Sequence, residues 1–308
     1  MNAIAGVMRQ TVTQISASVV IGVCALSGLA SSFARAGEVP SASLPSSSGV
    51  SRDRLAQAQT PPPVPPQPDP VPASRVPTTG IMGLTPAIED DLGVGHLRPE
   101  DLSFLANPDS DDNRSLLGAG WLQSAAIPIY IEPNGNHWGW IINGWLVPNG
   151  QAPIALGQDA SFLMWQTYPD LMSFPVKQLR EDGWFQFQYT PAGTAWAHVD
   201  HLDLGAIDLV IEPWEGRFAE VEQVAFRQHG LSKSLYSVPG SERASILGLV
   251  GPNSLIQPLA FEGDWMLVTV TQPTDGCSAF PGASTQEGWM RWRNEEQGAL
   301  IWFDPQGC

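Results

Sequence analysis

The chain has 308 residues and a formal net charge of −16, from 15 Lys and Arg against 31 Asp and Glu. This acidic balance argues against nucleic acid and anionic lipid as partners, because both are held by clustered cations. Hydrophobic residues form 43% of the chain and can build a core, whereas 30 Gly and 28 Pro predict many turns and few long helices.

Residues 1–36 have the pattern of a secretory signal peptide. Arg9 precedes an apolar stretch at residues 15–30, and the small residues of Ala34-Arg35-Ala36 follow it. As a helix, the stretch spans about 24 Å, short of a hydrocarbon core of about 30 Å. We therefore expect cleavage before Gly37, export to the periplasm or out of the cell, and no stable membrane span afterwards. An uncleaved anchor helix is one alternative, and a lipid anchor at Cys24 is a second, which Val23 directly before it disfavours.

Residues 37–118 are predicted to form a disordered linker, rich in proline and then in acidic residues. Successive prolines between residues 60 and 70 fix φ near −65° and donate no backbone hydrogen bonds, so this run is expected to form a polyproline II spacer. A ligand for a proline-binding groove is the alternative interpretation. Between residues 81 and 118 only a short helix starting at Pro99 is expected.

All 12 Trp residues lie in the region that follows, between Trp121 and Trp302. Runs of strand length there are apolar or alternate with polar residues, and Asn-Gly or Asp-Gly pairs separate several of them. Such pairs favour tight hairpins, because their residues tolerate positive φ. The runs are residues 127–131, 184–189, 208–211 and 264–271, and the turn pairs begin at residues 134, 143, 149, 182 and 275. The sequence therefore predicts an all-β region.

This region contains a weak internal repeat. A strand with Tyr and a turn proline is followed by a Gly-hydrophobic strand ending in Pro-Asn, then by a strand opened by Trp, and last by another Trp strand. Chance similarity is the alternative. We expect two domains, residues 119–203 and 204–308. The matched positions are Tyr130 and Tyr236, Pro148 and Pro252, Trp184 and Trp265, and Trp196 and Trp289.

The second copy, residues 235–292, resembles the bacterial SH3-like (SH3b) domain in its turn proline, its Gly-Asp-Trp strand opening and its final Gly-Trp strand. The first copy, residues 127–202, is similar but more diverged, and the two cover about half of the chain. The resemblance implies two small SH3-like β-barrels in tandem. It also implies a non-catalytic module that binds cell-wall glycan, peptide or an envelope protein.

Strand phase places Trp184 and Trp265 opposite the expected core. Every second residue is apolar within residues 185–189 and 266–270, so each Trp falls on the other strand face. An aromatic side chain on the outer face can stack on a sugar ring or a peptide. Burial under a loop or against the neighbouring barrel is the alternative. The predicted binding residues are Tyr130, Trp184, Trp196, Tyr236, Trp265 and Trp289.

No catalytic signature is present. His198 and His201 are three residues apart at the end of a predicted strand, so they are expected on opposite faces, and we expect no metal site and no cofactor. Cys277 lacks a helix-start context that would lower its pKa. We therefore expect a non-catalytic envelope adaptor. The alternatives are a cryptic envelope hydrolase, an inhibitor of one, or a structural or oligomerising envelope protein.

A disulfide between Cys277 and Cys308 is expected, since signal cleavage leaves these two cysteines in an oxidising compartment. Closing a loop of about 30 residues stabilises by about 3–4 kcal/mol in the chain-entropy description. Two unpaired thiols or an intermolecular bridge are the alternatives.

Overall fold

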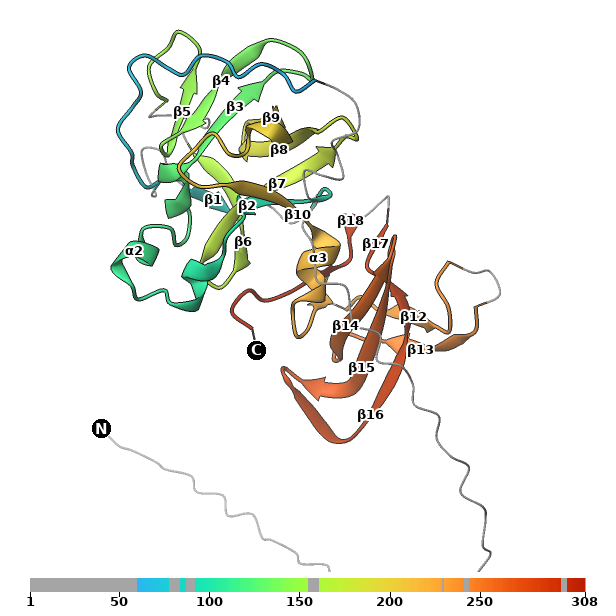
Figure 1. Ribbon diagram of the computed structural model, residues 1–308. Helices are drawn as coiled ribbons and strands as arrows, with labels where there is room; N and C mark the ends of the chain where they lie inside the picture. The colour runs from blue at the N-terminus through green and yellow to red at the C-terminus, as the bar shows by residue number, and fades with distance from the viewer. Residues whose placement is uncertain are drawn as a thin grey trace, which may run out of the picture. The chain divides into compact units, whose positions relative to one another are not determined.

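The computed structural model describes residues 60–77, 84–86, 92–154, 161–228, 230–240, 244–294 and 298–307. The chain is mostly β, as the sequence predicts, and its sheets are curled (Figure 1). The predicted signal peptide lies outside the described residues. Within the described ranges, no helix has both the length and the apolar character needed to cross a membrane.

Ten strands form the N-terminal sheet. Eight follow the order β1-β6-β7-β8-β9-β3-β4-β5, and β2 joins β7 to β10. Neighbouring strands pair antiparallel except β1 and β6, which are parallel. The strands are β1 (Leu84–Pro86), β2 (Gly95–Pro99), β3 (Ala126–Tyr130), β4 (His137–Ile142), β5 (Trp145–Pro148), β6 (Phe162–Tyr168), β7 (Leu171–Leu179), β8 (Trp184–Thr190), β9 (Gly193–His198) and β10 (Leu209–Pro213).

The Asn143-Gly144 pair forms a tight hairpin as predicted, whereas Asn149-Gly150 does not, because β5 and β6 are not neighbours in the sheet. Asn143 and Gly144 have φ of 53° and 79°, so both central residues of the β4–β5 hairpin are left-handed, as a two-residue turn of this kind requires. The core-face prediction is also confirmed for β8, where Phe185 and Phe187 are fully buried in the core of this sheet.

Residues 92–118 contain more structure than expected. They form β2 and two helical turns, η1 (Ser103–Ala106) and α2 (Asp111–Arg114). The prediction of a helix starting at Pro99 is wrong, because Pro99 is the last residue of β2. A third turn, η2 (Gly120–Ser124), precedes β3. Strand β2 forms because β10 pairs with it from more than 100 residues away. The N-terminal sheet therefore extends past the predicted domain boundary at residue 203.

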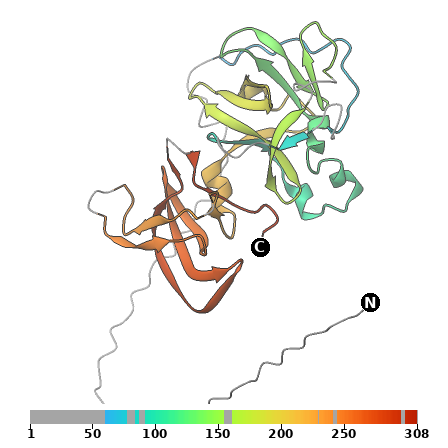
Figure 2. The same cartoon turned by 180° about the vertical axis from the view of Figure 1, so that it is seen from behind.

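Five strands form the C-terminal sheet, in the order β13-β12-β16-β15-β14. A long β15–β16 hairpin dominates it (Figures 1 and 2). Helix α3 (Trp214–Ala219) packs Trp214 and Phe218 into its core. The strands are β12 (Lys233–Tyr236), β13 (Ile246–Val250), β14 (Leu255–Glu262), β15 (Trp265–Asp275) and β16 (Ser278–Arg291), with two small pairs, β11 (Ala225–Phe226) with β19 (Ile301–Trp302) and β17 (Arg293–Asn294) with β18 (Gly298–Ala299).

Cys277 lies in the turn between β15 and β16, where the Asp275-Gly276 pair predicts a hairpin. Its Sγ is 3.6 Å from Nε2 of Gln223. The proposed partner, Cys308, lies outside the described residues, so the disulfide stays a prediction.

The two sheets share one strand order. The series β4-β3-β9-β8-β7 in the N-terminal sheet corresponds to β13-β12-β16-β15-β14 in the C-terminal sheet. The correspondence extends to the cross-strand neighbours of the repeated aromatic residues. The equivalent pairs are Tyr130–Trp196 and Tyr236–Trp289, and Trp184–His198 and Trp265–Arg291.

Candidate functional site: an aromatic groove that holds a proline segment

Residues 60–77, here named the proline segment, cross the N-terminal sheet over β4 and continue beside β5 (Figure 1). The prediction of a disordered spacer is therefore wrong for these residues. Positions 62, 65, 68, 72 and 75 are half-buried, and the other residues from 60 to 76 are exposed. These positions are three residues apart except for one step of four, from 68 to 72. A spacing of three is the repeat of a polyproline II helix, so one edge of the segment faces the sheet.

Side-chain donors of the sheet hold the carbonyl groups of the proline segment. A polyproline II helix has no internal hydrogen bonds, so every carbonyl of the segment is available to an outside donor. The donors, each 2.9 Å from its acceptor, are Trp140 Nε1 to Pro66, Asn143 Nδ2 to Pro72, Trp145 Nε1 to Ala73 and His201 Nε2 to Pro62.

The C-terminal end of the segment is fixed by backbone and stacking contacts. The Arg75 N–H donates to the Asn143 carbonyl at 3.0 Å, and the Arg75 guanidinium lies 4.5 Å above the Trp145 ring. Ser74 Oγ donates to the Gln123 carbonyl at 3.1 Å. Hydrogen bonds, aromatic surface and a cation–π contact therefore act together along the whole segment.

Trp184 lies on the face that strand phase predicts, opposite the core, but it is only 1% exposed. Its ring meets Tyr130 edge to face at 5.0 Å and His198 at 5.2 Å. The expectation of an accessible stacking surface is therefore wrong for Trp184. The reason is that histidines from β9 and η4 (Val199–His201) and the proline segment occupy the same side of the sheet.

The six predicted binding residues fall into two separate trios. The structure brings Tyr130 to Trp184 in the N-terminal sheet and Tyr236 to Trp265 in the C-terminal sheet. Trp196 and Trp289 are half-buried beside them. Sequence reasoning missed the donors of the groove, although the Trp residues around the Asn-Gly turn were a usable signal. The missed donors are Trp140, Asn143, Trp145 and His201.

His198 and His201 do not point to opposite faces, because β9 ends at His198 and a 3-10 turn begins. Their ring centres are 5.9 Å apart. Burial lowers the pKa of His201, and burial also lowers the pKa of His137, which lies on the other side of Tyr130. Across the described ranges, no cluster of three His, Cys, Asp or Glu side chains is placed to hold a metal ion.

We expect the proline segment to undock in acid. Burial in the folded chain lowers the pKa of His201, even though the hydrogen bond to the Pro62 carbonyl raises it, so the structure around His201 is stabilised above the ordinary pKa of 6.5 and loses this contribution as the pH falls through the lowered value. The rate of trypsin cleavage after Arg75 is measured by mass spectrometry at pH 8 and pH 5.5 and corrected for the activity of trypsin at each pH. The corrected rate should be higher at pH 5.5. His201→Gln keeps a donor for Pro62 without titrating, so it should reduce the difference. An unchanged pH dependence in this variant would contradict the assignment.

Gly144 is required for close approach of the segment. It has φ of 79°, and an added Cβ would overlap the Arg75 carbonyl oxygen. Gly144→Ala should therefore weaken docking by at least about 1.4 kcal/mol, a tenfold change, measured as faster trypsin cleavage after Arg75. Gly150→Ala is the matched control. Gly150 also follows an Asn and has a positive φ of 68°, but it faces open space. Equal acceleration by both substitutions would rule out the steric account.

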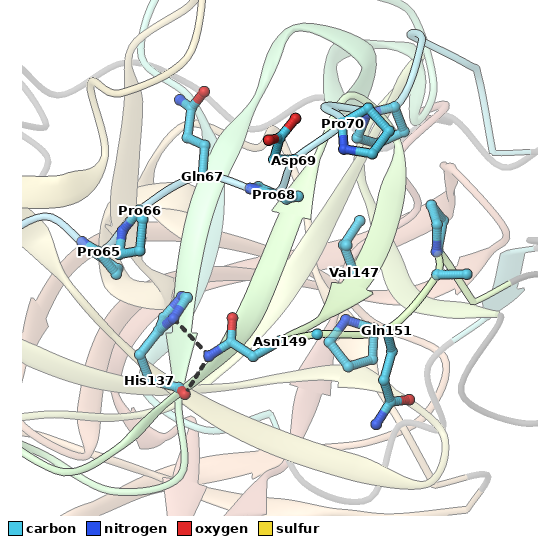
Figure 3. A pocket seen from close by; sticks show the side chains of 15 residues that line it. Pro65, Pro66, Gln67, Pro68, Asp69, Pro70, His137, Val147, Asn149 and Gln151 are labelled. Carbon is cyan, nitrogen blue, oxygen red and sulfur yellow. Dashed lines mark hydrogen bonds between the residues drawn. The ribbon is translucent and has the colours of Figure 1, made fainter.

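A cavity of about 850 Å³ separates part of the proline segment from the end of β5. Figure 3 shows residues 65–70 along one side and His137, Asn149 and Gln151 along the other. Asn149 Nδ2 is 2.6 Å from the His137 carbonyl and 2.9 Å from its Nδ1. The groove is therefore wider here than the segment that crosses it.

A buried charge cluster lies where β2 meets β10. Glu212, 3% exposed, accepts hydrogen bonds from Arg98 Nε at 2.6 Å and Tyr168 OH at 3.0 Å, and His96 Nε2 lies 2.9 Å away. Burial alone would raise the pKa of Glu212, but the contact with His96 and the charge of Arg98 lower it to about 2. Burial lowers the pKa of His96. A carboxylate, a guanidinium, a phenol and an imidazole therefore meet in this buried cluster.

No protein-family model matches the chain, and no curated protein is similar to it. The resemblance to SH3b domains therefore depends on the sequence motifs above, and the recurring strand order is compatible with it. The feature with the most defined contacts is the groove that holds the proline segment.

Proposed function

We propose that the chain is a non-catalytic binding protein of the cell envelope, built of two SH3-like barrels, and that its N-terminal groove binds proline-rich peptide. The observation that carries this proposal is the set of four side-chain donors bonded to carbonyls of the proline segment. Aromatic-lined grooves that bind preformed polyproline II segments are a recurring mode of peptide recognition. The proline segment acts as a ligand carried by the chain itself.

The ligand class follows from the donors. Three N–H donors of the groove come from two indoles and an amide, which carry no charge, and they bond to backbone carbonyls. Such a groove recognises an extended backbone and flat pyrrolidine rings rather than a charged group. The signal-like residues 1–36 support export, so the target is an envelope protein with proline-rich segments.

The test uses a full-length variant in which residues 61–73 are replaced by a Gly-Ser sequence of equal length. By fluorescence anisotropy, this variant should have one binding site for a labelled peptide with the sequence of residues 60–74 that the natural chain lacks. Trp140→Ala in the same background should weaken binding by at least about tenfold, as expected for a central aromatic contact.

Two altered peptides provide the control for binding mode. Alanine at positions 62, 65 and 68 removes prolines that face the groove, and alanine at 61, 63 and 70 removes prolines that face solvent. Only the first set should weaken binding strongly. Absence of binding, or an equal loss of affinity with both altered peptides, would contradict peptide recognition. The proline segment would then only cover the sheet as part of the fold. Sedimentation with insoluble peptidoglycan tests the glycan alternative, and released wall fragments would indicate a hydrolase.

A further inference from the structure

The outer face of the C-terminal sheet repeats an aromatic pair of the N-terminal sheet. Tyr236 and Trp265 meet edge to face at 5.4 Å and 83°, and Tyr130 and Trp184 meet at 5.0 Å and 88°. In both sheets the Tyr is paired across strands with the second Trp of the repeat, Trp196 or Trp289. The two faces therefore have the same aromatic geometry from the same strand register.

The two faces differ in how much of them is exposed. Tyr130 and Trp184 are 5% and 1% exposed, whereas Tyr236 and Trp265 are only half-buried. Cross-strand partners share a face, so Ile246 beside Tyr236 belongs to this surface. We name the surface the C-terminal aromatic face, which consists of Tyr236, Ile246 (63% exposed), Leu249 (64% exposed), Trp265, Leu267 and Trp289.

The polar groups of this face can bind an extended peptide, although the donors differ from those of the N-terminal groove. The indole N–H groups of Trp265 and Trp289 donate to no residue that the structure describes, so both are available to a peptide carbonyl. The Arg291 guanidinium lies 4.9 Å from the Trp265 ring with 47% of its side chain exposed, and it is 3.5 Å from Asp264. Residues 60–74 contain one Asp and no Lys or Arg. A peptide of this composition is complementary in charge to the exposed Arg291.

We propose that the C-terminal aromatic face binds a proline-rich, carboxylate-bearing extended segment of a separate protein. The proline segment of the same chain is held in the N-terminal groove by its four side-chain donors. This inference rests on the proposed function, because it takes the ligand chemistry from the occupied groove. It makes the protein bivalent for such segments, with one site filled by the chain itself and one open to partners.

The test uses the full-length chain, in which the N-terminal groove is filled. The probe is a labelled peptide with the sequence of residues 60–74. It should bind with 1:1 stoichiometry, and Trp265→Ala should weaken binding at least about tenfold. Leu249→Asp changes a side chain that is 64% exposed, so it should weaken binding without affecting folding. Phe280→Ala is the control, because Phe280 is an exposed aromatic of β16 outside this face.

Each outcome separates this inference from the proposed function. Binding to the intact chain that is lost with Trp265→Ala and Leu249→Asp, and kept with Phe280→Ala, supports the open site. Binding only to the variant with a replaced proline segment overturns the open site and leaves the groove as a peptide site. No binding to either protein overturns both. Sedimentation velocity of the unliganded chain tests a further occupant. A dimer that Leu249→Asp abolishes would show that a second copy of the chain covers this face, and would overturn the proposal of a separate partner protein.

Discussion

Glu212→Ala is expected to lower the free energy of unfolding by about 3–5 kcal/mol, because it leaves buried cations without their counter-charge. Arg98 is bonded to Glu212 at 2.6 Å, and its side chain is 12% exposed. Arg217 is 6% exposed and lies 3.9 Å above the Tyr168 ring, whose OH also donates to Glu212. Urea unfolding at pH 7, followed by Trp fluorescence, measures the loss.

Glu212→Gln separates the charge from the packing. The folded-state pKa of Glu212, about 2, lies below its ordinary value of 4.5. Its ionisation therefore stabilises the fold above pH 4.5, and this contribution is lost as the pH falls towards 2. Glu212→Gln should be less stable than the natural chain at pH 7 and should lack this part of the acid dependence. Identical pH profiles for the two proteins would show that the carboxylate charge is not a source of stability.

Trp184→Ala is expected to destabilise the chain by about 3–5 kcal/mol, the range for a large aromatic removed from a buried site. Trp184 is 1% exposed and is packed between Tyr130 and His198, so its removal leaves a cavity. Its repeat equivalent, Trp265, is half-buried and should have a smaller effect. Thermal and urea unfolding of the two variants give the comparison.

Phe185→Ala is the reference for a core residue, because Phe185 is fully buried on the opposite face of the same strand. Trp184→Ala should match its loss of stability and should also speed cleavage after Arg75. A loss for Trp184→Ala that is no larger than that for Trp265→Ala would contradict the burial argument.

Local signals in the sequence predicted much of the β structure. Turn pairs such as Asn143-Gly144 and alternating runs such as residues 184–189 depend on neighbouring residues, and the structure confirms both. The repeat was visible because Tyr and Trp recur at equivalent positions of the two copies. Strand β2 was missed, because its stability depends on β10 and on the ionic contact of Arg98 with Glu212, 114 residues away.

The groove was predicted only in part for a related reason. Strand phase assigns Trp184 to a face, but it does not reveal what covers that face. The composition of residues 60–77 predicts a polar, extended segment, and such a segment can be either a free spacer or a docked ligand. The deciding contacts join residues more than 70 positions apart, as Trp140 to Pro66 and His201 to Pro62 show.

Covalent attachment of the proline segment sets a threshold for any competitor. A ligand joined covalently to its binding site by a short connection acts at an effective concentration of the order of millimolar. A free peptide of equal intrinsic affinity therefore fills half of the N-terminal grooves only near that same concentration. On the proposed function, isolated peptides would be excluded at micromolar levels, whereas a surface or polymer that presents many proline-rich segments at high local density would exchange with the attached one. The groove would then respond to the density of such segments rather than to their mere presence.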